Sequence, residues 1–104
     1  MPYRWMSYEQ AHAWEGDAQR EGVSTTARSA NGFMREYERA KYASAMRIRN
    51  LPAGVRGGAT WGQKREAFVA RTLAQYDENP TYRRGLSLIM WAYMPRGFIE
   101  KYRC

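Results

Sequence analysis

The chain has 104 residues, with 17 Lys and Arg against 10 Asp and Glu, and a formal net charge of +7. This length allows one domain, and the 14% aromatic content argues against intrinsic disorder, because disordered chains are poor in aromatic residues. No apolar run reaches the roughly 20 residues that a membrane helix needs, and no secretory signal is visible, so we expect neither a transmembrane segment nor secretion. The single cysteine, Cys104, excludes an internal disulfide and a cysteine-based zinc site.

The excess positive charge lies in the middle of the chain. Residues 1–22 carry a net charge of −2, residues 23–76 carry +7 and residues 77–104 carry +2. A clustered positive surface attracts polyanions, mostly without sequence selectivity. A net charge of this size is also ordinary for keeping a small domain soluble. Both interpretations stay open, and the clustering favours an anionic partner.

Four helices are predicted, and no convincing strand. The first spans about residues 7–22, because Ser7-Tyr8-Glu9-Gln10 has the form of a capping box and Gly22 is a residue type that ends helices. The second spans about residues 29–46, with apolar residues at i, i+4 and i+7. Residues 47–59 are rich in Gly and Arg and predict a loop, which at this length is typical of a binding loop or a mobile segment.

The third helix starts at a second capping box, Thr60-Trp61-Gly62-Gln63. The fourth spans about residues 82–94, with Asn79 or Thr81 as its cap, and is apolar on nearly all sides. That pattern is typical of a buried central helix. A short basic tail follows at residues 95–104. We therefore predict an all-α, compact single domain over residues 1–104, with three to four helices around a buried C-terminal helix.

The sequence offers little for catalysis. His12 is the only histidine, and no nucleophile-elbow pattern accompanies it. The glycines at residues 54–58 precede a helix, yet the Lys-Ser/Thr pair of a nucleotide-binding loop is missing. We expect a protein that is not an enzyme, with no catalytic residue, no metal and no cofactor.

Basic residues at two helix starts are a more informative signal. Arg83 and Arg84 lie in the first turn of the predicted fourth helix, where each opposes the helix dipole by roughly 0.3–1 kcal/mol. Lys64 and Arg65 repeat the arrangement in the third helix. Either these side chains bind phosphate together with the helix N–H groups, or they pair with acids across a turn. The acids in question are Asp77, Glu78 and Glu66.

Three blocks of sequence carry a resemblance. They lie within residues 22–33, 61–76 and 79–93, and the most specific is Asn79-Pro80-Thr81-Tyr82-Arg83-Arg84 with the apolar run after it. Over about residues 22–94 the chain resembles small basic proteins of unknown function that tailed bacteriophages encode. The resemblance implies a phage origin, and therefore the host cytoplasm or the virion as location, and it assigns no catalytic residues. Phage accessory proteins of this size commonly bind nucleic acid, virion components or a host enzyme.

We therefore predict a non-enzymatic phage accessory protein that binds nucleic acid, DNA rather than RNA, through phosphate contacts from a basic surface. The predicted contact residues are Arg47, Arg49, Arg56, Lys64, Arg65, Arg83 and Arg84. Candidates for stacking on bases are Trp61, Tyr42 and Phe98, although aromatic side chains at helical spacing more often belong to the core.

The alternative is a protein-interaction role, as a virion structural component or as a binder or inhibitor of a host protein. The basic surface would then meet an acidic protein surface. Trp and Tyr are enriched in interaction hot spots, so aromatic residues near the two ends of the chain are candidate anchors. These are Trp5, Trp14, Phe98 and Tyr102.

Overall fold

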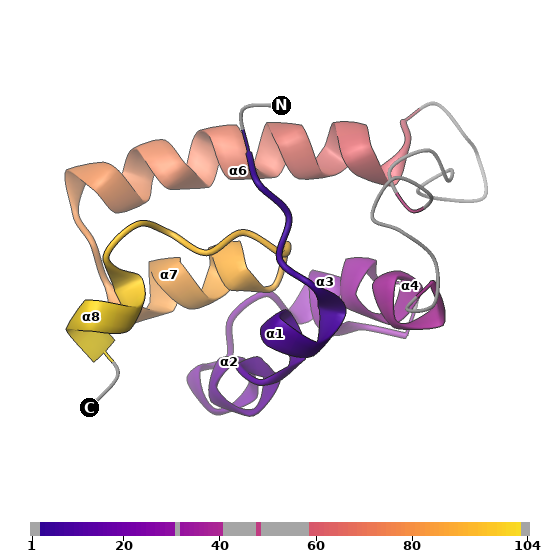
Figure 1. Ribbon diagram of the computed structural model, residues 1–104, viewed down its shortest axis with the longest axis horizontal. Helices are drawn as coiled ribbons and strands as arrows, with labels where there is room; N and C mark the ends of the chain where they lie inside the picture. The colour runs from indigo at the N-terminus through magenta and orange to yellow at the C-terminus, as the bar shows by residue number, and fades with distance from the viewer. Residues whose placement is uncertain (1–2, 31, 41–47, 49–58, 103–104) are drawn as a thin grey trace.

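The computed structural model describes residues 3–30, 32–40, 48 and 59–102. Within them the chain forms seven helices and no strand, which confirms the predicted all-α class (Figure 1). In chain order the helices are α1 (Tyr8–His12), α2 (Glu15–Glu21), α3 (Thr25–Arg28), α4 (Phe33–Arg39), α6 (Trp61–Glu78), α7 (Tyr82–Ile89) and α8 (Phe98–Tyr102). The loop predicted at residues 47–59 lies outside the described residues, apart from its positions 48 and 59.

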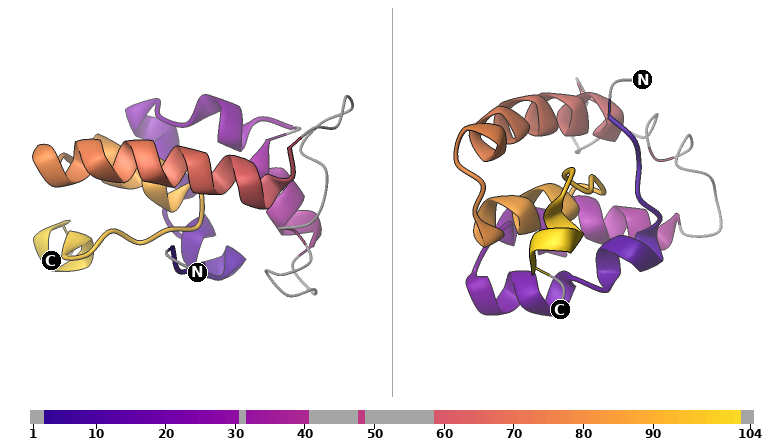
Figure 2. Two further views of the ribbon diagram at one scale, coloured as in Figure 1. Left: turned by 90° about the horizontal axis from the view of Figure 1, so that it is seen from above. Right: turned by 60° about the vertical axis from the view of Figure 1, so that its left-hand side comes forward.

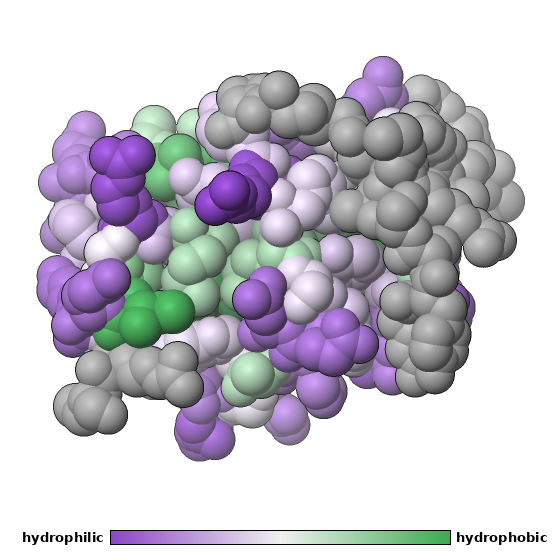
Figure 3. Space-filling view, in the orientation of Figure 1, coloured by the Kyte–Doolittle hydropathy of each residue, from purple (hydrophilic) through white to green (hydrophobic). Residues whose placement is uncertain are grey.

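Helix α7 occupies the centre of the fold. It lies between the long helix α6 and the N-terminal helices, and it packs against α6 on one side and α2 on the other (Figures 1 and 2). Leu86, Leu88 and Ile89 are fully buried there. The prediction of a buried C-terminal helix is therefore confirmed. The face drawn in Figure 3 is mixed: hydrophilic residues lie along the left and lower edges and also near the middle, with apolar residues between them.

The end of α7 differs from the prediction. The helix stops at Ile89 and not near Met94, because the chain reverses at Ala92, whose φ of +61° lies in the left-handed region. The N–H of Ala92 donates to the carbonyl of Ile89 (2.8 Å), and the N–H of Tyr93 donates to that of Leu88 (3.1 Å). This pair of bonds is a Schellman motif, a helix ending that glycine usually occupies. With alanine in the left-handed position, the sequence carries no signal for it.

The first predicted helix is divided in two. The capping box at its start is confirmed, since the Ser7 hydroxyl accepts from the Gln10 N–H and the Gln10 side chain accepts from the Ser7 N–H, both at 3.1 Å. The break falls at Ala13 and Trp14. Gly22 ends α2 as predicted, with a φ of +69°. Residues 7–22 therefore form two short helices where one was expected.

The second predicted helix starts later than expected. It begins at Phe33, and the short helix α3 precedes it. Gly32 caps α4 in an extended conformation, in close contact with α3. A Cβ atom at Gly32 would lie 2.1 Å from the carbonyl oxygen of Thr26, so only glycine permits this approach. The predicted continuation at residues 41–46 lies outside the described residues.

Helices α6 and α7 begin where the sequence indicates. The Thr60 hydroxyl accepts from the Gln63 N–H at 3.2 Å, and the Gln63 side chain accepts from the Thr60 N–H at 2.9 Å, which confirms the second capping box. Of the two candidate caps for α7, Thr81 is the one used, and its hydroxyl accepts from the Arg84 N–H. Pro80 therefore precedes the cap and does not occupy the first turn.

The aromatic residues proposed as partner anchors pack against the core, and three of the four are half-buried. Phe98 is fully buried, and it contacts the rings of Trp14, Tyr82 and Tyr102 at centroid distances of 5.3, 5.7 and 4.9 Å. Trp5 contacts two buried core rings of α4. These contacts hold the N-terminal segment and α8 against the core. Phe98 is therefore unable to anchor a partner or to stack on a base. The role of the half-buried Trp5, Trp14 and Tyr102 as anchors stays a prediction.

Alkaline pH should destabilise the protein through Tyr82. Burial, together with the hydrogen bond that its hydroxyl donates to Asp17, raises the pKa of Tyr82 to about 12. The unfolded chain releases this proton near pH 10, so the stabilising contribution is complete below about pH 10 and is lost between about pH 10 and 12. We expect Tyr82→Phe to lower the free energy of unfolding at neutral pH by about 1 kcal/mol and to make its alkaline decline shallower.

Urea denaturation at a series of pH values from neutral to about pH 11 measures both effects. The decline should be reduced and not abolished, because burial also raises the pKa of Tyr8, Tyr37 and Tyr76. Parallel declines in Tyr82→Phe and the wild type would contradict the assignment.

Candidate nucleic-acid interface

Arg65 is the largest fully buried side chain among the described residues. Its guanidinium donates to four backbone carbonyls, from Nε to Trp91 (2.7 Å), from Nη1 to Tyr3 (3.1 Å), and from Nη2 to Arg4 (2.8 Å) and Ala92 (2.9 Å). It also lies 4.2 Å from the centre of the Trp5 ring. The side chain thus joins α6, the end of α7 and the N-terminal segment.

The prediction that Arg65 contacts nucleic acid is therefore wrong. Its charge is enclosed by the protein, and its donors are directed at carbonyl oxygens and not at solvent. A sequence signal for this role exists, because Arg65 lies four residues after Trp61 and four before Val69, and both of these are buried. At helical spacing the arginine falls on the apolar stripe of α6.

Arg83 and Arg84 are engaged with the protein itself. Arg83 donates to the carbonyl of Glu21, and its Nη1 atom lies 3.7 Å from that residue's carboxylate. Arg84 donates to the carbonyl of Asn79 at 2.8 Å and to that of Gln75 at 3.4 Å, at the end of α6. A cation is favourable at the C-terminus of a helix. The interaction of Arg84 with the end of α6 therefore offsets the unfavourable position of its charge at the start of α7. The acid that pairs is Glu21, which the sequence did not indicate.

Lys64 is the one predicted contact residue that the structure describes as exposed and without such a partner. Arg71, which sequence reasoning missed, lies seven residues further along α6 and is also exposed. The two side chains lie on the same face of the helix, roughly 10 Å apart along its axis. Neither makes an ion pair or hydrogen bond with any residue that the structure describes. The predicted contacts Arg47, Arg49 and Arg56, and the stacking candidate Tyr42, lie outside the described residues.

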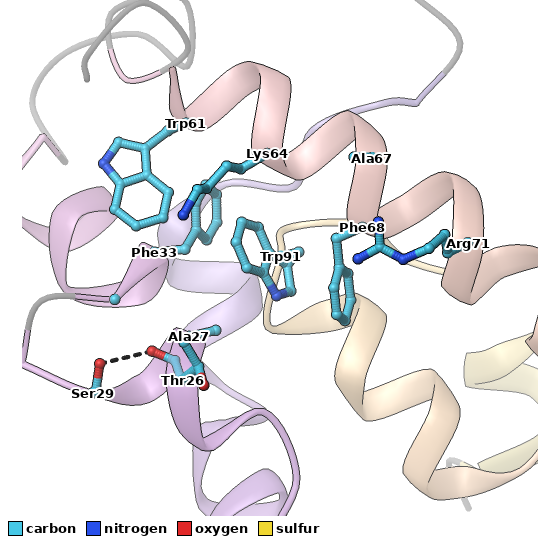
Figure 4. Close-up of a pocket in the computed structure, with 11 residues that line it drawn as sticks. Thr26, Ala27, Ser29, Phe33, Trp61, Lys64, Ala67, Phe68, Arg71 and Trp91 are labelled. Atoms are coloured by element: carbon cyan, nitrogen blue, oxygen red, sulfur yellow. Dashed lines mark hydrogen bonds between the residues drawn. The ribbon is translucent and has the colours of Figure 1, made fainter. Parts of the chain in front are cut away.

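A cavity of about 390 Å³ lies between these two cations. Its walls come from α6, the start of α4, the end of α3 and Trp91 (Figure 4). Lys64 reaches from α6 toward the rings of Trp61 and Phe33, and Arg71 bends back toward Phe68. The lining residues are Thr26, Ala27, Ser29, Gly32, Phe33, Trp61, Lys64, Ala67, Phe68, Arg71 and Trp91. No acidic residue is among them.

Aromatic rings form the wall of the cavity nearest the core. Trp91 stacks on Phe33 and on Phe68, with centroid distances of 4.8 and 5.1 Å and interplanar angles of 22° in both cases. Trp61 contacts Phe33 edge-on at 5.8 Å. Phe33, Trp61 and Trp91 are buried, whereas Phe68 is half-buried. The wall is therefore fixed by core packing, and the stacking candidate Trp61 does lie at the site.

Hydroxyl groups lie across the cavity from these rings. Thr26 and Ser29 are both exposed, and the Ser29 hydroxyl donates to the Thr26 carbonyl at 2.7 Å. A hydroxyl that donates in this way retains acceptor capacity. The site thus combines an apolar aromatic wall, two cations and a pair of polar groups. This composition suits a planar ring joined to an anion.

Other chemistries have less support in the described part of the chain. It holds no group of three His, Cys, Asp or Glu side chains arranged to bind a metal ion. Among the described helices, none combines the length and the apolar character required to cross a membrane. His12 lies 2.7 Å from the Glu15 carboxylate and stacks on the Tyr8 ring. It is not among the residues that line the cavity.

Comparisons of the chain with protein-family models, with curated protein sequences and with solved structures found no match. The phage origin implied by the resemblance therefore stays a prediction, and the site is interpreted from its own geometry.

Proposed function

We propose that the protein binds nucleic acid without catalysing a reaction, and that the exposed face of α6 makes the phosphate contacts. One observation carries the proposal: Lys64 and Arg71 share this face and have no acidic partner among the described residues. The exposed Arg20 and Arg39 differ, since Arg20 pairs with Asp17 and Arg39 pairs with Glu36. Arg4 and Arg96 are exposed without an ion pair to any described residue, but they do not belong to α6. A cation without an internal partner is available to an external anion at no cost in lost ion pairs.

The charge of the whole chain supports the same partner. With a net charge of +7, the protein attracts polyanions, and attraction to phosphates supplies much of the affinity of nucleic-acid binding. Arg71 adds a planar guanidinium, which is suited to grip a phosphate with two parallel hydrogen bonds. This proposal is narrower than the seven-residue surface predicted from sequence.

A protein partner has less support. That alternative combines the basic surface with four aromatic anchors, of which one, Phe98, is fully buried and the other three are half-buried against the core. A smaller cavity of about 290 Å³ lies elsewhere, lined by Met6, Gln10, Ala13, Trp14, Met94 and Ile99. No charged residue lines it, so it offers nothing to the acidic surface that the alternative requires.

The salt dependence of binding tests the proposal. Each phosphate contact contributes about 0.7–0.9 to the slope of log affinity against log salt, so the double variant Lys64→Gln/Arg71→Gln should reduce the slope by between one and two. Fluorescence anisotropy of a labelled oligonucleotide, titrated at four salt concentrations, measures it.

The matched control is Arg20→Gln/Arg39→Gln, which removes the same charge from two exposed arginines that already pair with carboxylates. We expect a clearly smaller change of slope in this control. Equal changes of slope in the two double variants would show that binding depends on net charge alone and not on the positions of Lys64 and Arg71. Absence of binding by the wild type at about 50 mM salt would refute nucleic-acid binding altogether.

A further inference from the structure

We infer that the cavity between Lys64 and Arg71 accepts one unpaired nucleobase of a bound strand, so that the protein prefers single-stranded over duplex nucleic acid. The inference rests on the proposed function and adds to it the part of the ligand that fills the cavity. Its basis is the position of an aromatic, acid-free cavity between two exposed cations that have no acidic partner among the described residues.

The size and lining of the cavity fit a single aromatic ring system. Its volume of about 390 Å³ lies near the lower end of the roughly 300–1,000 Å³ range of small-molecule sites. Phe68 is the half-buried ring of this wall and the one that a base could stack on, since every base has a π-face. Trp61 and Trp91 are buried and contribute apolar carbon beside it. The aromatic wall carries no charged group, so a neutral base that packs against it does not bury a charge.

The positions of Lys64 and Arg71 indicate where the phosphates of a bound strand would lie. Lys64 and Arg71 flank the cavity along α6, so phosphates on either side of an inserted base would face them. On the opposite side, the hydroxyls of Thr26 and Ser29 are placed to meet the polar edge of the base. A strand running along α6 would thus place its backbone against the cations and one base between them.

A base-paired nucleotide does not fit this arrangement. Within a duplex the base faces are stacked and the pairing edges are occupied, so a base reaches an aromatic wall only when it is unstacked. Residues of α3, α4 and α6 and Trp91 line the partly open cavity, so a base would reach its aromatic wall only after leaving the stack of a duplex. Duplex binding would use the same cations and leave the cavity empty.

A cavity-filling substitution separates the cavity from the phosphate contacts. Ala67 lines the cavity and is exposed, so Ala67→Leu fills it without disturbing the core. Ala70→Leu is the matched control, because Ala70 is also exposed on α6 and lies outside the cavity. Both variants retain every charge of the wild type.

The experiment compares a labelled 12-nucleotide single strand with a hairpin duplex of equal phosphate number by anisotropy, together with tryptophan fluorescence. For the wild type and Ala70→Leu, we expect affinity about tenfold higher for the single strand, and quenching by the inserted base. Ala67→Leu should lose both the preference and the quenching while keeping its duplex affinity and salt slope.

Three outcomes would overturn the inference. If the wild type binds both forms equally while Lys64→Gln/Arg71→Gln still reduces the salt slope, the base site fails and the proposed function stands. If a free nucleoside monophosphate binds as tightly as the strand, the cavity is a small-ligand site. If neither oligonucleotide binds, the proposed function fails as well.

Discussion

Replacing Arg65 with methionine is expected to lower the free energy of unfolding by about 3–5 kcal/mol. Methionine is apolar and flexible and occupies much of the same space. The cost therefore comes from the four carbonyls that would lose the Arg65 donors. Those of Tyr3, Arg4 and Trp91 lose the guanidinium, while that of Ala92 keeps the Met6 N–H as a donor at 2.7 Å. Since small domains have about 5–15 kcal/mol of stability in total, this single change removes a large share of it.

Urea denaturation followed by tryptophan fluorescence measures the loss. Arg65→Lys should fall between the wild type and Arg65→Met, because an ammonium keeps the charge but does not reproduce the planar fork of donors. Lys64→Met is the neighbouring control and should change stability by no more than about 0.5 kcal/mol, since Lys64 is exposed. A loss below about 1 kcal/mol in Arg65→Met would show that the four bonds contribute little.

Gly32→Ala is expected to cost about 2–3 kcal/mol. The added Cβ would lie 2.1 Å from the carbonyl oxygen of Thr26 and 2.5 Å from that of Ala27. Both atoms belong to the backbone, so no side-chain rotation relieves the overlap, and α3 and α4 would have to separate.

Gly16→Ala is the control for Gly32→Ala, and it should change stability in the opposite direction. Gly16 lies within α2, and a Cβ there would meet only the end of the Arg20 side chain at 3.6 Å. Alanine is favoured over glycine inside a helix by up to about 1 kcal/mol, so a gain is expected. Thermal unfolding of the two variants gives the comparison, and melting temperatures that shift in the same direction would contradict it.

Local motifs made much of the helical architecture predictable. The capping boxes at Ser7 and Thr60 and the glycine at Gly22 mark helix ends in the structure because each depends only on residues a few positions apart. The end of α7 depends on tertiary packing instead. Ala92 adopts a left-handed conformation that its sequence context does not indicate, so the unbroken apolar run predicts an unbroken helix where the structure has a helix end.

The candidate site was less predictable than the fold. Positive charge at helix starts predicts phosphate contacts for Arg65, Arg83 and Arg84. In the structure their side chains donate instead to backbone carbonyls that folding brings close. Arg71 lies in the middle of α6, where no terminus marks it. The aromatic wall joins residues as distant as Phe33 and Trp91, and such a wall exists only after the helices pack.

The bonds of Arg65 also have a consequence for the order in which the chain folds. Those to Trp91 and Ala92 span 26 and 27 residues, whereas those to Tyr3 and Arg4 span 62 and 61. Closing the longer loops costs roughly 0.7 kcal/mol more in chain entropy, so the α6–α7 hairpin should engage the guanidinium first. The N-terminal segment would then dock in a late step of folding, and its Tyr3 and Arg4 carbonyls would accept the remaining hydrogen bonds of Arg65.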